Sequence, residues 1–297
     1  MQCEKNKFFL YFARLVVTLP LKKRMKNKLL NIKGKLFSLE KPVVMGILNV
    51  TPDSFFAESR MQNETAVTAR IEAIITEGGA IVDIGGCSSR PGADVIPQEE
   101  EWRRLEPTLN ILAEKFPQIP VSIDTFRADI AKRAVEEYGV AVINDISGGS
   151  MDDDMFVTVA KLNVPYILTH FQQTAQKINL FQAEVMSYFA EKLQILRRLG
   201  VNDIILDPGF GFGKTLEQNY ELMRSMHNFS IFFECPLLVG ISRKSMIYSV
   251  LGHTATESLN GTTVLNTYSL LNGADILRVH DVKAAVEAVK LIEKIKK

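Results

Sequence analysis

A glycine-rich stretch in the second half of the chain, DPGFGFGKT at residues 207–215, ends in Gly-Lys-Thr and so resembles a phosphate-binding P-loop. In a P-loop a glycine stands five positions before the Gly-Lys pair, so that successive backbone N–H groups wrap the phosphates. The residue at that position is Pro208, which has no N–H and a fixed φ. Gly209, Gly211 and Gly213 also miss the spacing of a dinucleotide-binding loop. The stretch argues against an ordinary nucleotide site, and its glycines require another explanation.

A set of polar residues stands at or near the ends of short apolar runs along the chain. They are Asn49, Asp83, Asp124, Asn144, Asp145, His170, Asp207, Ser242, Arg243, Lys244, Arg278 and His280. Each has an ordinary interpretation, because a strand-end aspartate often caps a helix or holds a turn, and a lone histidine is often a buried structural residue. Their common placement after every run favours a shared site.

The runs themselves predict the fold. They are VVMGILNV, AIVDIGG, VSIDT, AVINDIS, PYILTH, DIILDPG, PLLVGIS and ADILRVH, eight in all. Each is nearly continuously apolar, as expected for a parallel strand buried on both faces, and segments with helical spacing that stop at glycine lie between them. This α/β pattern predicts a closed (β/α)₈ TIM barrel, with an open doubly wound sheet as the alternative.

The segment before the first run predicts a β-hairpin extension. LLNIKGKLFSL, residues 29–39, has a glycine at its centre and is expected to cover the N-terminal face of the barrel. Residues 25–297 are read as one barrel domain, and residues 1–24 as a disordered or untranslated extension with Met25 as an alternative start. A signal peptide or anchor is the competing interpretation of the apolar FFLYFARLVVTLPL, although Arg14 interrupts it and no cleavage pattern follows.

Composition restricts the class of function. The 297-residue chain is 46% hydrophobic and 23% charged with net charge +1, which indicates a globular protein that binds small ligands rather than nucleic acid or membrane. Its three cysteines, Cys3, Cys87 and Cys235, are far apart and odd in number, so neither a disulfide framework nor a zinc site is predicted. We expect a reducing cytoplasmic location.

The strand-end residues indicate the chemistry of the ligand. Barrels often bind phosphate through the loops after strands seven and eight, and those loops carry Ser242, Arg243, Lys244, Arg278 and His280. Asp124, Asn144 and Asp207 offer acceptors and an amide that suit a flat heterocycle with several N–H groups. The glycines after Asp207 would let the backbone approach this ring closely, with Phe210 and Phe212 as apolar walls.

Motifs in a fixed order identify a known family. They are MGILNVTPDSF (45–55), DIGG followed by SSRPGA (83–93), SIDT (122–125), INDISGG (143–149), DPGFGFGK (207–214), GISRKSM (240–246) and RVHDV (278–282). On these the chain resembles the dihydropteroate synthases of folate biosynthesis. The resemblance implies a barrel that condenses 6-hydroxymethyl-7,8-dihydropterin diphosphate with 4-aminobenzoate to 7,8-dihydropteroate, releasing diphosphate. It also implies a Mg²⁺ ion and a homodimer through the helices of the second half of the barrel.

The resemblance assigns roles residue by residue. Asn49 resembles the Mg²⁺ contact, and Arg278 with His280 resembles the diphosphate pair. The residues that resemble the pterin pocket are Asp124, Asn144, Asp207 and Lys244. Those that resemble the aminobenzoate site are Phe55, Ser89, Arg90, Pro91, Phe212 and Ser242. The residues expected to act in catalysis are Asp124, Lys244, Arg278 and His280.

Three departures separate the chain from the family pattern. Cys87-Ser88-Ser89 stands where Glu-Ser-Thr is usual, FAESR follows Phe55 in place of Asp-Gly-Gly, and Thr169-His170 replaces Met-His. They bear on the mobile loops, aminobenzoate affinity and sulfonamide sensitivity. Besides the synthase, the alternatives are a pterin-dependent methyltransferase, which has no need for the diphosphate pair, a non-catalytic pterin-binding paralogue, and a P-loop NTPase.

Overall fold

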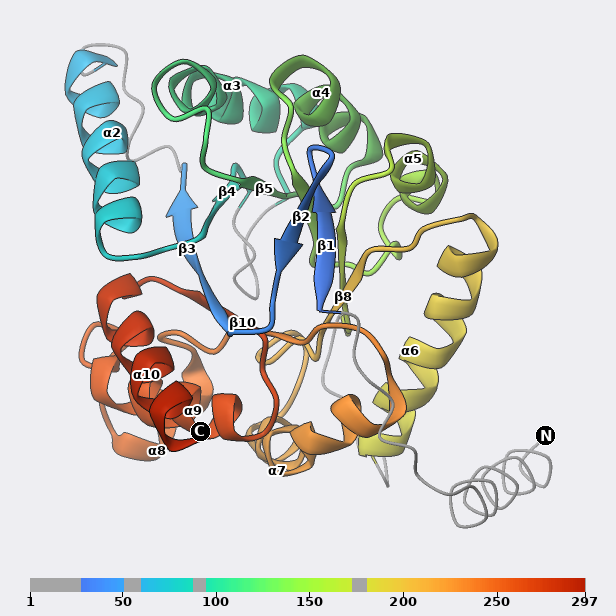
Figure 1. Ribbon diagram of the computed structural model, residues 1–297, viewed down its shortest axis with the longest axis vertical. Helices are drawn as coiled ribbons and strands as arrows, with labels where there is room; N and C mark the ends of the chain where they lie inside the picture. Colours follow the sequence, from blue (N-terminus) through green and yellow to red (C-terminus); the bar gives the residue numbers. More distant parts are fainter. Residues whose placement is uncertain (1–27, 51–59, 88–94, 173–180, 297) are drawn as a thin grey trace.

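The computed structural model describes residues 28–50, 60–87, 95–172 and 181–296. Its strands are β1 (Leu29–Ile32), β2 (Lys35–Ser38), β3 (Val43–Asn49), β4 (Ile81–Gly85), β5 (Val121–Asp124), β6 (Val142–Asp145), β7 (Tyr166–Thr169), β8 (Ile204–Asp207), β9 (Leu238–Val239) and β10 (Ile276–Val279). Its helices are α2 (Arg60–Thr76), α3 (Gln98–Lys115), α4 (Ala128–Tyr138), α5 (Met155–Leu162), α6 (Phe181–Arg198), α7 (Leu216–Phe232), α8 (Ser245–Leu251), α9 (Leu259–Leu271) and α10 (Val282–Ile295). The helices surround the strands (Figure 1).

The parallel strands form a closed ring. Consecutive strands from β3 to β8 are neighbours, and β10 pairs with both β9 and β3. A parallel bridge between Leu206 and Leu237 joins β8 to the segment that leads into β9 and so completes the circle. The structure thus confirms the predicted (β/α)₈ barrel and excludes the open sheet.

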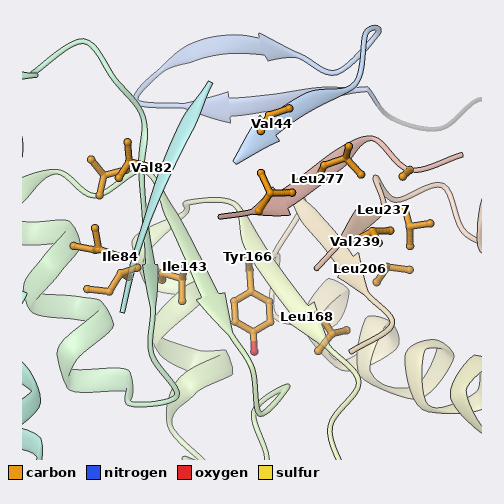
Figure 2. Packing of buried hydrophobic residues seen from close by; sticks show 14 of the residues in the cluster. Val44, Val82, Ile84, Ile143, Tyr166, Leu168, Leu206, Leu237, Val239 and Leu277 are labelled. Atoms are coloured by element: carbon orange, nitrogen blue, oxygen red, sulfur yellow. The ribbon is translucent and has the colours of Figure 1, made fainter. Parts of the chain in front are cut away.

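Strand alternation decides which side chains enter the barrel. One set of alternate residues forms an inner cluster that includes Met45, Ile81, Val142, Ile167, Ile205, Leu238 and Ile276. The other set packs between strands and helices, where Val82, Ile143 and Leu168 are seen in Figure 2. Two residues further along each strand, the inner face carries Asp83, Asn144, Thr169, Asp207 and Arg278. The same period of two therefore makes an apolar floor and a polar mouth.

The predicted hairpin is present and covers that floor. Lys33 and Gly34 both have positive φ, 51° and 76°, as a two-residue turn between twisted strands requires. Leu30 and Ile32 are almost fully buried and belong to the inner cluster, so β1 covers the N-terminal end of the barrel. Figure 1 shows the hairpin lying across the ring of strands.

Two expectations about the N-terminal region and membrane spans concern the limits of the barrel domain. The predicted extension at residues 1–24 lies outside the described residues, so the domain boundary at residue 25 stays a prediction. Among the helices that are described, none is both long and apolar enough to cross a membrane.

Candidate active site

The centre of the barrel mouth is an arginine shared by two carboxylates. Arg278 on β10 donates from Nε to Asp83 Oδ2 at 2.6 Å and from Nη2 to Asp124 Oδ2 at 2.5 Å. Asn144 on β6 donates its amide N–H to Asp83, at 3.3 and 3.2 Å from the two oxygens. Four strands thus supply one hydrogen-bonded cluster.

The pKa values of Asp124 and Arg278 reflect burial and the sharing of one guanidinium between two carboxylates. Burial raises the pKa of Asp124 to about 7, since the attraction of Arg278 is partly cancelled by repulsion from Asp83. Burial alone would lower the pKa of Arg278, but the two aspartates outweigh it and hold the guanidinium charged. The cluster therefore combines a fixed positive charge with a carboxyl group, that of Asp124, which titrates near neutral pH.

A second carboxylate and a lysine lie beside this cluster. Asp207 at the end of β8 accepts the backbone N–H of Gly209 at 2.8 Å, and burial raises its pKa. The Lys244 ammonium lies 4.3 Å from the centroid of the Phe212 ring and donates to the carbonyl of Phe210. Burial lowers the pKa of Lys244 to about 8, opposed by attraction to Asp207. The wall at β8 and β9 therefore offers an acceptor, a donor and an aromatic face.

His280 completes the mouth as a neutral imidazole. Its Nδ1 lies 3.0 Å from the Ser242 hydroxyl oxygen, which also accepts the His280 backbone N–H at 3.2 Å. Burial, followed by repulsion from Arg278 and Arg243, lowers the pKa of His280 to about 4. The carbonyl of His280 accepts from Arg70 at 2.7 Å, which ties β10 to α2.

The basic run after β9 divides between two roles. Arg243 has a positive φ of 57° and forms two hydrogen bonds to the Asp281 carboxylate, at 3.0 and 2.5 Å. Its guanidinium is therefore engaged with a neighbouring acid, while Lys244 reaches the wall of the site.

Packing between two loops explains the glycines of DPGFGFGKT. A Cβ on Gly209 would lie 2.0 Å from the carbonyl oxygen of His170, and one on Gly213 would lie 1.9 Å from that of Gln172. The Lys214 ammonium donates to three carbonyls, those of His170, Gly209 and Phe212, at 2.9, 2.7 and 3.2 Å. The lysine that a P-loop would present to phosphate is therefore occupied by backbone, which removes the nucleotide interpretation.

The same loop corrects one detail of the predicted ring pocket. Phe212 lies against Lys244 as a wall, but Phe210 is fully buried in the cluster between strands and helices. The expectation that the glycines admit the backbone to a ligand also gives way, at Gly209 and Gly213, to close contact with the loop after β7.

Two strand-end residues point away from the site, as alternation requires. Asp145 accepts the N–H groups of Ser147 and Gly149 and the hydroxyl of Tyr166, each at 2.7 Å, so it holds the loop after β6. The His170 ring is fully buried, edge-on to Tyr188 with ring centroids 4.8 Å apart. For Asp145 and His170 the ordinary interpretation is therefore correct: the aspartate holds a turn, and the histidine is a buried structural residue.

Sequence reasoning gave no role to two groups that shape the mouth. Asp83 stands two residues after the inward Ile81, and this spacing is the sequence signal that it faces into the barrel, where it pairs with Arg278. Glu101 on α3 is fully buried, pairs with Arg127 and accepts the Thr125 hydroxyl at 2.8 Å. Nothing in the charged run QEEEWRRLE distinguishes Glu101 from the more exposed Glu99 and Glu100.

Several predicted residues have no described position. Phe55, Ser89, Arg90 and Pro91 lie outside the described residues, so their assignment to the aminobenzoate site stays a prediction. Asn49 is described and ends β3 with an exposed side chain at the rim.

A metal ion can be tested against the residues at the rim. In the described parts of the chain, no group of three or more His, Cys, Asp or Glu is placed to hold a metal. Mg²⁺ commonly keeps several waters and uses one or two protein oxygens together with substrate phosphates. The exposed amide oxygen of Asn49 fits that mode of binding.

Known proteins of one family resemble this chain in both sequence and structure. The sequence profile of the family described as "Pterin binding enzyme" matches residues 45–280. The dihydropteroate synthase of Clostridium beijerinckii is 38% identical over 268 residues, covering 89% of this chain and 98% of the relative. The solved structure of a Clostridium difficile dihydropteroate synthase in the presence of pteroic acid is similar with a TM-score of 0.82 at 34% identity, covering 86% of this chain and 97% of that one. That of Xanthomonas albilineans dihydropteroate synthase with 4-aminobenzoic acid has a TM-score of 0.84 at 33% identity, covering 91% and 98%.

Proposed function

The chain belongs to the dihydropteroate synthases, and we propose that its barrel mouth joins a pterin diphosphate to 4-aminobenzoate through the residues described above. The observation that carries the assignment of roles is the cluster of Arg278, Asp83 and Asp124, which combines a buried cation with carboxylates at the mouth of the barrel. The relatives solved in the presence of pteroic acid and with 4-aminobenzoic acid support the same ligand classes here.

The ring of the pterin is proposed to bind against β5, β6 and β8. Asp207 has one oxygen engaged by Gly209 and accepts ring N–H and amino groups with the other. Asn144 and Lys244 supply donors for ring acceptors, and Phe212 provides an apolar surface. Asp124 on β5, Asn144 on β6 and Asp207 on β8 are inward residues on separate strands, and together they fix the orientation of a flat ring.

The diphosphate is proposed to bind at Arg278 and His280. A dianionic or trianionic ligand beside His280 favours the protonated imidazole, so binding raises the pKa of this residue from its low value in the free protein. Asn49 would hold Mg²⁺ at the same group. When bound, the ion would neutralise charge on the leaving diphosphate.

The reaction requires charge stabilisation more than a base. The bond between the pterin methylene carbon and the diphosphate oxygen breaks, a bond from the aminobenzoate nitrogen to that carbon forms, and the nitrogen loses a proton, which the departing diphosphate takes up. Positive charge develops on the methylene and the ring, and the Asp124 carboxylate stabilises it. Arg278, already beside the bound diphosphate, stabilises the negative charge that grows on it as the bond breaks.

The second substrate is proposed to bind beside Phe212 and Ser242, together with the predicted loop residues Phe55, Ser89, Arg90 and Pro91. Ser242 is buried and bonded to His280, so this substrate would lie next to the diphosphate pair. Exclusion of water from this space protects the electrophilic carbon.

A homodimer through α8 and α9 is the proposed assembly. Helix α9 buries Thr262, Asn266, Ser269 and Leu270, whereas Val264 and Leu271 are 58% and 53% exposed. Tyr268 lies between them at helical spacing, and Val250 and Leu251 of α8 are also exposed, so three of the four buried side chains of α9 are polar while an apolar face lies outward. A second copy of the chain is the proposed occupant, and a cytoplasmic location is proposed from the cysteine pattern.

One assay tests the proposed function directly. Purified protein is mixed with 6-hydroxymethyl-7,8-dihydropterin diphosphate, Mg²⁺ and labelled 4-aminobenzoate, and labelled dihydropteroate is measured. Product that depends on both substrates supports the proposal. Tight binding of the pterin diphosphate with no product would favour the non-catalytic interpretation raised by the altered loops.

A further inference from the structure

Thr169 is a buried residue inside the barrel whose hydroxyl the fold leaves unused. It is the last residue of β7, it is fully buried, and its Oγ1 has no hydrogen-bond partner among the described residues. Ile167, two positions earlier, belongs to the inner cluster, so alternation directs Thr169 to the inner face at the level of the mouth.

The neighbours of Thr169 are residues of the proposed ring pocket. Its Cα is the register partner of Asp207 on β8. On its other side β6 carries Asn144, whose register partner on β7 is Ile167, two residues before Thr169. Neighbouring strands lie about 4.8 Å apart, so the two side chains of a register pair stand side by side. Thr169 therefore stands beside the carboxylate that is proposed to bind the ring, one inward-facing position further along its strand than the level of the amide.

Local structure accounts for the backbone of Thr169 but not for its hydroxyl. The carbonyl accepts the Tyr188 hydroxyl at 3.0 Å, and Oδ1 of the adjacent Asp207 accepts the Gly209 N–H. A buried hydroxyl without a partner is less favourable than an apolar side chain of the same shape, because it has lost its hydrogen bonds to water. An apolar side chain at this position would avoid that cost.

We propose that the Thr169 hydroxyl is a specificity-determining group of the ring pocket, accepting a hydrogen bond from the exocyclic amino group of the ring that Asp207 binds. This inference rests on the proposed placement of the ring. An amino group carries two hydrogens, and a carboxylate that accepts one of them together with a ring N–H leaves the second hydrogen for another acceptor. The hydroxyl beside Asp207 is in position to be that acceptor.

Removal of the Thr169 hydroxyl should affect ligand binding and protein stability differently. Thr169→Val keeps the shape of the side chain and removes the hydroxyl, so the free protein is expected to be equally stable or more stable while it binds the ring less tightly. A purely structural role for the hydroxyl would instead lower the stability of the variant. Thr169→Ser keeps the hydroxyl and serves as the matched control.

Calorimetric titration with 6-hydroxymethyl-7,8-dihydropterin diphosphate tests the proposal. Thr169→Val is expected to raise the Kd roughly three- to tenfold, the worth of one hydrogen bond, and Thr169→Ser to stay within about twofold of the parent. With the analogue that carries hydrogen in place of the exocyclic amino group, parent and Thr169→Val are expected to bind equally. Equal Kd values of parent and Thr169→Val for the natural ligand, or a penalty that persists with the analogue, would overturn the inference.

Asp207→Asn distinguishes failure of this inference from failure of the ring placement. If Asp207→Asn weakens binding and Thr169→Val does not, the ring lies at Asp207 and only the role of Thr169 is wrong. If Asp207→Asn leaves the Kd unchanged, the ring binds elsewhere, and both the placement and the role of Thr169 are overturned.

Discussion

Arg278 Nη2 lies 2.5 Å from Asp124 Oδ2, although the two residues are 154 positions apart in the chain. The same guanidinium binds Asp83 on a third strand, so its single positive charge is divided between two carboxylates. Because one positive charge faces two carboxylates, this buried cluster keeps an uncompensated negative charge when both acids are ionised. It is suited to a reaction in which positive charge develops near the acids and negative charge leaves beside the arginine.

Replacement of Asp124 by asparagine should separate binding from chemistry. Asp124→Asn keeps the shape of the side chain and removes the charge that stabilises the electrophilic methylene. We expect kcat to fall about 100-fold, with a smaller change in KM for 4-aminobenzoate. Steady-state formation of dihydropteroate measures both constants.

The matched control for that variant is Asp129→Asn. Asp129 is exposed on α4, five residues after Asp124, and has no place in the site. Its substitution should leave kcat unchanged. A kcat for Asp124→Asn within twofold of the parent would rule out charge stabilisation by this residue.

The raised pKa of Asp124 predicts how stability depends on pH. The carboxyl has a pKa of about 7 in the folded protein against an ordinary 3.8, so the folded state holds a proton that the unfolded state has lost between these values. Stability contributed by this group is therefore present below about pH 4 and is lost as pH rises to about 7. Asp124→Asn lacks this loss, so its free energy of unfolding relative to the parent should rise by on the order of 2 kcal/mol between pH 5 and pH 8. Urea unfolding at both pH values measures it, and a constant difference would contradict it.

The sequence was enough to predict the barrel and most of its mouth, because both follow from simple periodicities. Continuous apolar runs predicted buried parallel strands, and polar residues at their ends predicted where the site lies. The direction of each side chain required one further step. Asp207 and Asp145 both end a strand, yet only Asp207 lies an even number of residues from the inner apolar layer, and only it enters the barrel.

Other features depended on contacts that no local pattern records. The loop after β8 takes its glycines from contact with the loop after β7, so their spacing indicated a nucleotide site only as long as that neighbour was unknown. Glu101 looks like any acidic residue of a helix start until the fold places Arg127 and Thr125 against it. Sequence reasoning failed where two distant segments meet.

Lys214 is predicted to hold a loop rather than to bind phosphate. Lys214→Met removes the donor to three carbonyls and should lower the free energy of unfolding by about 2 to 4 kcal/mol. Lys132→Met, on the exposed side of α4, should change it by less than about 0.5 kcal/mol. Urea unfolding at pH 6 gives both values. Equal stability of the parent and Lys214→Met, or binding of magnesium-ATP that Lys214→Met abolishes, would restore the P-loop interpretation.

The inverted polarity of α9 predicts that one charge on its outer face disrupts the proposed dimer. Val264 is 58% exposed and lies one turn before Tyr268, so Val264→Asp places a carboxylate within the apolar face without disturbing the barrel. Burying that charge against a second copy would cost several kcal/mol, and we expect the variant to sediment as a monomer of 33.3 kDa while the parent sediments at twice that mass. Val157→Asp makes the same change at an exposed valine of α5 and should leave the mass of the assembly unaltered. A parent that sediments as a monomer, or a Val264→Asp variant that remains dimeric, would show that α8 and α9 are not the interface.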